Sequence, residues 1–156
     1  MKSKTPSLVL IIVCLLIVFI TGFIGTLFMS QAQNSDWYQS VKSSLTPPNW
    51  LFAPIWTVLY FLFAIVLALS WVYTKPERKP FLVALIALNL FTNAIWSFFF
   101  FYLRNPRLAF LDLITLWISI VALMIFNKKQ KGIVYLLIPY LLWVTFAGLL
   151  NYLAIK

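Results

Sequence analysis

The sequence predicts an all-α integral membrane protein, with one membrane domain over residues 1–156 folded as a bundle of five transmembrane helices. The chain is 63% hydrophobic and has a mean hydropathy of +0.98, which lies outside the range of soluble globular domains. Its apolar residues gather in five long runs, and the only formal charge inside any run is that of Asp112. The runs are continuously apolar, whereas the strands of a membrane barrel alternate, so helices are favoured.

Each run is long enough to cross the hydrocarbon core, which takes roughly 20 residues of helix. The expected spans are Leu8–Met29, Trp50–Tyr73, Phe81–Leu103, Leu108–Phe126 and Gly132–Ile155. The first run could also be read as a signal peptide, because Ser30-Gln31-Ala32 loosely resembles a cleavage site. We favour a retained helix, because the run is longer than a signal core of about 7–15 residues.

The first connection, over residues 30–49, is much longer than the other three. It holds Trp37 and Tyr38, and Pro47-Pro48 stiffens its exit into the second span. Long loops in compact folds often act as lids or binding elements, so we expect this segment to fold over the outer mouth of the bundle. The alternative is a linker that its aromatic residues anchor at the membrane interface.

The basic residues predict the orientation of the bundle. Eight of the 12 fall on the side of the N-terminus and four on the other side. Because basic residues are retained on the cytoplasmic side, we expect a multi-pass protein of a bacterial cell membrane with its N-terminus in the cytoplasm. The bases are scattered through short connections, so the bilayer is an expected partner and nucleic acid is not.

Conventional catalytic and metal-binding motifs are missing from the sequence. It contains no histidine, one cysteine and four glycines, none of them in a phosphate-binding loop. No carboxylate pair or triad is present. We therefore expect no metal site and no resident cofactor.

Aromatic side chains are abundant, with 15 Phe, 7 Trp and 7 Tyr. Helical spacing places several of them on common faces with small or polar residues. The three faces hold Trp56, Tyr60 and Phe63; Asn89, Asn93, Trp96 and Phe100; and Pro139, Trp143, Ala147 and Leu150. Such faces suit a flat apolar ligand with a few polar edges. The alternative is helix packing in which the asparagines form interhelical hydrogen bonds.

Asp112 lies one turn inside the fourth span, close to Arg104 and Arg107 in sequence. A negative charge is favourable at that end of a helix, so we expect a structural role in which Thr115 and Ser119 donate hydrogen bonds to it. The alternative is a proton or ligand site, which a small proton-coupled transporter would need.

Several short motifs resemble those of the translocator protein/tryptophan-rich sensory protein (TspO) family, also known as peripheral-type benzodiazepine receptors. The motifs are Trp37-Tyr38, Pro47-Pro48-x-Trp50, Ala53-Pro54-x-Trp56-x-x-Leu59-Tyr60, Asn93-x-x-Trp96, Leu108-Ala109-x-x-Asp112 and Pro139-Tyr140-Leu141-x-Trp143-x-x-Phe146-Ala147-x-x-Leu150-Asn151. Together they cover the chain from Trp37 to its end.

The resemblance implies a five-helix bundle, often a homodimer, with a ligand cavity that opens toward residues 30–49. Family ligands are protoporphyrin IX, haem, isoquinoline carboxamides, benzodiazepines and, in animals, sterols. With the helical faces, it gives the expected ligand-binding residues Trp56, Tyr60, Asn93, Trp96, Trp143, Ala147 and Leu150, with Trp37, Pro47, Pro48 and Trp50 at the mouth.

Two functions follow from this resemblance. The first is a receptor or binding protein for porphyrins and related flat hydrophobic molecules, with a role in tetrapyrrole regulation or transport. The second is light-dependent oxidative degradation of protoporphyrin IX, in which Trp56 and Trp143 would be the catalytic residues. An excited porphyrin is itself a photosensitiser, so the second function needs no acid–base pair.

Overall fold

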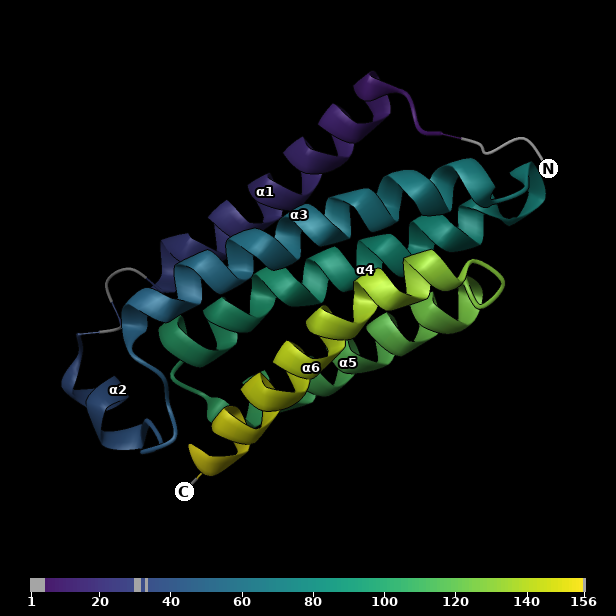
Figure 1. Ribbon diagram of the computed structural model, residues 1–156. Helices are drawn as coiled ribbons and strands as arrows, with labels where there is room; N and C mark the ends of the chain where they lie inside the picture. Colours follow the sequence, from purple (N-terminus) through teal and green to yellow (C-terminus); the bar gives the residue numbers. More distant parts are fainter. Residues whose placement is uncertain (1–4, 30–31, 33, 156) are drawn as a thin grey trace.

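The computed structural model describes residues 5–29, 32 and 34–155, and this part of the chain is a helical bundle (Figure 1). Five of its helices are long and apolar enough to cross a membrane, which confirms the predicted fold class. They are α1 (Leu8–Met29), α3 (Asn49–Tyr73), α4 (Lys79–Ser97) continued by the π-helical turn η2 (Phe98–Tyr102), α5 (Pro106–Phe126) and α6 (Lys131–Leu153). The two short elements are α2 (Asp36–Val41) and the 3-10 turn η1 (Pro76–Arg78).

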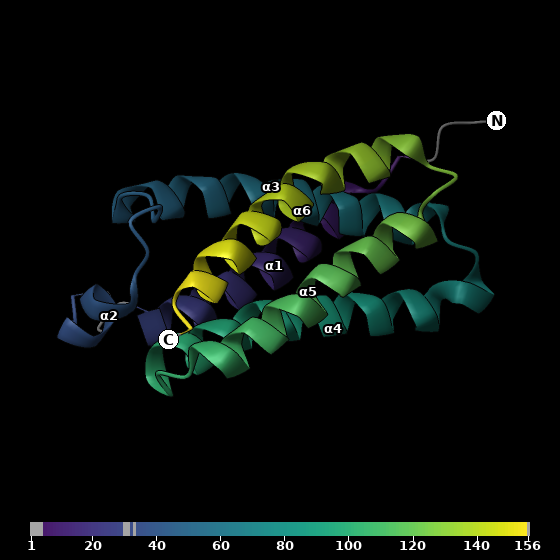
Figure 2. The same cartoon turned by 90° about the horizontal axis from the view of Figure 1, so that it is seen from below.

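The five long helices close into a ring. Helix α1 packs against α3 and α4, α3 also packs against α6, and α5 joins α6 to α4 (Figure 2). Element α2, the α4–α5 connection and the end of α6 lie at one end of the bundle, and η1 and the α5–α6 connection lie at the other (Figure 1). We call these the α2 end and the η1 end.

Local chemistry sets the boundary between η2 and α5. Arg104 has a φ of 50°, a left-handed conformation that reverses the chain direction there. Asn105 then caps α5, because its side-chain Oδ1 accepts the Leu108 N–H at 3.0 Å. Pro106 occupies the first turn, where a missing N–H costs no intrahelical hydrogen bond. Helix α5 therefore begins two residues before the span that hydropathy alone predicts.

Glycines allow α1 to lie close to its neighbours. A Cβ atom on Gly22 would overlap the Tyr60 ring of α3, and one on Gly25 would lie 3.4 Å from the Ser97 Oγ of α4. Lipid supplies no hydrophobic force that drives helices together, so close van der Waals packing of this kind carries much of their association. Gly22 and Gly25 thus fix how closely α1 approaches α3 and α4.

The direction of the bundle in the membrane stays a prediction. Of the residues used for it, Lys2, Lys4 and Lys156 lie outside the described part of the chain, as do Ser30 and Gln31 of the cleavage-like sequence. Labelling of single cysteines introduced at either end with an impermeant maleimide would test the orientation.

We predict that Gly22→Ala destabilises the bundle, because the added methyl group displaces the Tyr60 ring from its position against α1. Overpacking of this kind costs about 1–3 kcal/mol. The measurement is thermal unfolding in detergent followed with a thiol-reactive dye, since the buried Cys14 becomes accessible only on opening.

The matched control for this prediction is Gly148→Ala, because nothing lies within 4 Å of the added methyl group at that position. Alanine is the better helix former, so the control should unfold at the same temperature as the parent or slightly higher. Equal transitions for the two variants would contradict the packing role of Gly22.

Candidate functional site

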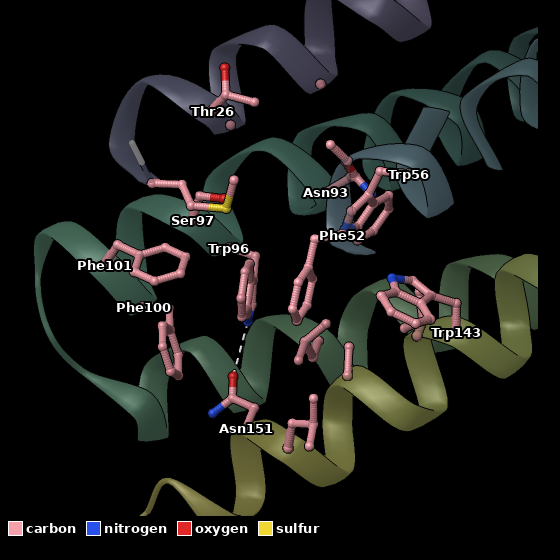
Figure 3. A pocket seen from close by; sticks show the side chains of 18 of the residues that line it. Thr26, Phe52, Trp56, Asn93, Trp96, Ser97, Phe100, Phe101, Trp143 and Asn151 are labelled. Atoms are coloured by element: carbon pink, nitrogen blue, oxygen red, sulfur yellow. Dashed lines mark hydrogen bonds between the residues drawn. The ribbon is translucent and has the colours of Figure 1, made fainter. Parts of the chain in front are cut away.

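A cavity of about 380 Å³ lies in the half of the bundle next to α2 (Figure 3). All five spanning helices contribute to its lining, and so does the segment that contains α2. The lining is mostly apolar and aromatic, with a few polar groups. Its size and composition match those of sites that bind small organic molecules.

Most residues of the three helical faces that the sequence predicts meet at this cavity, although Phe63, Asn89 and Pro139 do not line it. Its lining includes Trp56, Tyr60, Asn93, Trp96, Trp143, Ala147 and Leu150. The indole rings of Trp56 and Trp143 are perpendicular, with their centroids 6.5 Å apart. Phe52 extends this aromatic surface, since its ring lies edge-on to Trp143 at 5.8 Å. Helices far apart in the sequence therefore present rings to one space.

The four residues expected at the mouth do not line the cavity. Trp50 is 71% exposed, and Pro47 and Pro48 are likewise absent from the lining. Trp37 packs edge-on against Phe100 at 5.6 Å instead. The segment contributes other residues, namely Tyr38, Lys42, Ser43 and Thr46.

Tyr38 is the main contact between α2 and the helices. It is 6% exposed, and its ring lies 6.4 Å from that of Phe100 and 5.5 Å from that of Phe101. Burial raises the pKa of the Tyr38 phenol, so the group stays neutral at physiological pH. The segment after α1 is thus fixed to η2 by aromatic packing and closes the cavity at the α2 end.

A chain of hydrogen bonds lies beside the cavity and links four helices. The Tyr60 hydroxyl donates to Asn93 Oδ1 at 3.1 Å, and Asn93 Nδ2 donates to the Tyr140 hydroxyl at 3.0 Å. Tyr140 donates in turn to Asn89 Oδ1 at 3.2 Å, and Asn89 Nδ2 donates to Ser119 Oγ at 2.8 Å. The asparagines therefore form interhelical hydrogen bonds, and Asn93 also lines the cavity.

A second network fixes the Trp96 ring. Its Nε1–H donates to Asn151 Oδ1 at 2.9 Å, and Asn151 Nδ2 donates to the Pro106 carbonyl at 2.7 Å (Figure 3). The Trp96 ring stacks on Phe100 with a centroid distance of 5.1 Å. These contacts join α4, α5 and α6 at the α2 end and hold one aromatic wall in place.

Trp143 has an unpaired hydrogen-bond donor. Its Nε1 is buried and makes no hydrogen bond, whereas the Trp117 Nε1–H donates to Thr145 Oγ1 at 2.9 Å. Figure 3 shows the Trp143 ring among the side chains that line the cavity, but its nitrogen is covered by protein atoms. A buried donor without a partner is costly, and a ligand acceptor would pair with it only after neighbouring side chains move aside.

Sequence reasoning missed the contribution of α1. Phe19, Gly22, Phe23, Gly25, Thr26 and Met29 of this helix line the cavity. Phe23 on α1 and Ala53 and Thr57 on α3 line it and are also exposed on the outside. The cavity therefore opens sideways between α1 and α3. The α1 residues lie before Trp37, outside the motifs, and their types carry no chemical signal.

Asp112 lies outside this site. It is 9% exposed, and its Oδ2 has no hydrogen-bond partner. The expectation that Thr115 and Ser119 donate to it is wrong, because these hydroxyls bond to the carbonyls of Leu111 and Leu116 on their own helix. Asp112 does not line the cavity, so the geometry gives it no part in ligand contact.

Comparison with known proteins agrees with this architecture. The chain matches the TspO/MBR family over residues 10–155. It is 37% identical to Tryptophan-rich protein TspO of Archaeoglobus fulgidus over 145 residues, which cover 91% of this chain and 92% of that protein. It is also 37% identical to Tryptophan-rich protein TspO of Chlorobaculum tepidum, with 89% of each chain covered.

An animal protein also aligns with most of the chain. The Translocator protein of Ovis aries is 34% identical over 137 residues, which cover 84% of this chain and 79% of that protein. The family match spans nearly the whole sequence, and these relatives align over most of their own lengths. On this basis, and with five membrane-spanning helices around an aromatic cavity, the chain belongs to the TspO/MBR family.

Proposed function

We propose that this protein is a membrane receptor for porphyrins, with protoporphyrin IX as the representative ligand, and that it takes part in tetrapyrrole regulation or transport. The observation that carries the proposal is the cavity of about 380 Å³ lined by Trp56, Trp96 and Trp143. A porphyrin has a wide apolar face and polar edges. Related flat molecules such as isoquinoline carboxamides share that description.

The ligand would stack its face on one of the perpendicular rings of Trp56 and Trp143 and meet the other edge-on. Removing its apolar surface from water would supply most of the binding free energy. A shift of the side chains that cover the Trp143 nitrogen in the empty protein would let its unpaired Nε1–H donate to a carboxylate of the ligand. Asn93 would serve mainly by position, because its Oδ1 and Nδ2 already bond to Tyr60 and Tyr140.

The sideways opening supports a transport role. Phe23, Ala53 and Thr57 border it on α1 and α3, so a membrane-dissolved molecule could enter from the bilayer without first crossing water. The opening also means that a macrocycle need not be wholly enclosed by the cavity. The name of the Translocator protein of Ovis aries fits such a role.

Lys42 would orient the ligand. It is the one basic residue among the described side chains that line the cavity, and it lies on the segment that closes the α2 end. The two propionates of protoporphyrin IX lie on the same edge of the macrocycle. Charge complementarity would draw one propionate toward Lys42 and leave the other for the Trp143 Nε1–H.

We predict that Trp143→Phe weakens protoporphyrin IX binding about 3- to 10-fold, because it removes a hydrogen bond worth roughly 0.5–1.5 kcal/mol while retaining an aromatic ring. The measurement is a titration followed by the shift of the porphyrin Soret band. The matched control is Trp117→Phe, since Trp117 does not line the cavity. Unchanged affinity of Trp143→Phe, or equal losses in both variants, would count against this site.

Lys42→Gln should weaken binding of the porphyrin diacid by up to about 5-fold, in keeping with the upper end of about 1 kcal/mol for an exposed ion pair. The same variant should bind protoporphyrin IX dimethyl ester as the parent does, because the ester has no negative charge. Arg107→Gln is the control, since it removes a charge at the α2 end from outside the cavity lining. A loss that is the same for acid and ester would remove Lys42 from the proposed role.

The perpendicular contact of Trp56 with Trp143 favours the second candidate function, photo-oxidative degradation of the bound porphyrin. An excited porphyrin beside these rings could take an electron from one indole and pass it to dissolved O2, and the neighbouring indole could reduce the oxidised one. The superoxide formed in this way would be the oxidant that attacks the macrocycle. The protein would then supply orientation and an oxidisable side chain, with no proton-transfer group required.

Illumination of the purified protein with protoporphyrin IX tests this activity. We expect the Soret band to disappear faster than in detergent alone, and we expect Trp143→Phe to slow the loss at saturating porphyrin, where weaker binding is compensated. Trp56→Phe should act in the same direction. Equal rates for the parent and both variants would leave binding as the function and exclude these tryptophans as reactants.

A further inference from the structure

A second hollow lies at the opposite end of the molecule from the aromatic cavity. It has a volume of about 360 Å³ and lies between the last turn of α5 and the first turns of α6. Its lining consists of Met124, Ile125, Lys128, Lys131, Val134 and Tyr135, none of which lines the cavity next to α2. We call it the η1-end groove.

The groove is apolar on the bilayer side and basic at its rim. Met124 and Ile125 belong to the end of α5, and Val134 lies one turn inside α6. Ile125 is exposed, whereas Met124 and Val134 are half-buried. Lys128 and Lys131 lie in and directly after the connection between the two helices. This order, with cations above an apolar floor, matches the layout of a phospholipid with its headgroup above its acyl chains.

The two groove lysines differ from Arg78 and Lys79 at the same end. Arg78 lies over the Phe126 ring at 4.6 Å, and Lys79 lies over the Trp71 ring at 4.1 Å. Lys128 and Lys131 have no ring or carboxylate partner within the described part of the chain. Their charges are therefore available to an external anion.

The start of α6 adds to the positive potential. The helix begins at Lys131, and its N-cap residue Gln130 makes no side-chain hydrogen bond to the first turn. The first N–H groups of a helix lack intrahelical acceptors, and the helix dipole places partial positive charge there. Glu77 is the only acidic residue at this end of the described chain, and it belongs to η1.

We propose that the η1-end groove binds an anionic phospholipid. The phosphate lies between Lys128 and Lys131, and an acyl chain covers Met124, Ile125 and Val134. The Tyr135 side chain, which is 64% exposed, borders the headgroup region. The site is independent of porphyrin binding, because the two hollows share no lining residue.

The apolar floor is the reason for choosing a lipid over a free anion. Ile125 is 62% exposed beside the lysines, and inorganic phosphate would leave it uncovered. An acyl chain bound along the floor would add apolar contact to the attraction between phosphate and ammonium groups. The groove should therefore distinguish an anionic lipid both from a zwitterionic lipid and from phosphate alone.

The test is native mass spectrometry of the full-length protein in detergent, titrated with dioleoyl phosphatidylglycerol or dioleoyl phosphatidylcholine. We expect the phosphatidylglycerol adduct to form at lower lipid concentration. Removing each groove lysine should weaken it roughly fivefold, as expected for basic residues near an anionic lipid surface. The test variant is therefore Lys128→Gln/Lys131→Gln, and the control is Lys75→Gln/Lys129→Gln, which removes equal charge from the same end outside the groove.

The proposal is supported if only the groove variant loses its preference for phosphatidylglycerol while a tenfold excess of inorganic phosphate leaves the adduct in place. Equal losses in the two variants would reduce the effect to general surface charge and overturn the site. Displacement of the lipid by inorganic phosphate would overturn the choice of a phospholipid. The groove variant should bind protoporphyrin IX as the parent does, because the two hollows share no lining residue, and loss of that binding would overturn the independence of the two sites.

Discussion

The need to satisfy polar side chains inside hydrocarbon is the constraint on which this structure depends. Lipid offers no hydrogen bonds and no hydrophobic force between helices, so polar groups within the bundle must bond to each other. A series of hydrogen bonds meets this requirement. It runs from Tyr60 on α3 through Asn93 on α4, Tyr140 on α6 and Asn89 on α4 to Ser119 on α5. Because Tyr60 and Asn93 also line the cavity, the interactions that fix the helices also fix one wall of the site.

The α2 end is organised differently, by aromatic packing around a local break in helix geometry. The π-helical turn η2 presents both Phe100 and Phe101 to the cavity, although they are consecutive in sequence. Tyr38 packs against both rings, and Trp96 stacks on Phe100. Aromatic rings therefore attach the closing segment to η2. π-Helical turns inside α-helices occur frequently at functional sites, and here the turn shapes the cavity.

Sequence was sufficient for the spans and for the faces of α3, α4 and α6, because hydropathy and helical periodicity are local properties. It predicted Phe100 on one of these faces but not Phe101, since a π-helical turn breaks the regular spacing. The sequence prediction placed Trp37 at the mouth of the cavity. The register of α2 instead makes Tyr38 the residue that lines the cavity. The predicted hydrogen bonds from Thr115 and Ser119 to Asp112 are wrong for a related reason. Both hydroxyls find backbone acceptors on their own helix at no entropic cost.

The unpaired donor of Trp143 gives the cavity a preference that its shape alone would not. Trp96 and Trp117 show that this bundle can supply indole partners from Asn151 and Thr145. Leaving the Trp143 Nε1–H without one costs stability in the empty protein, and any ligand without an acceptor leaves that cost in place. A flat hydrocarbon and a porphyrin could gain similar contact with the rings, but only the porphyrin has an acceptor that recovers the missing hydrogen bond once the side chains covering the donor move aside. Selectivity among flat molecules would then come from a polar group that the fold leaves unsatisfied, and affinity from the aromatic walls around it.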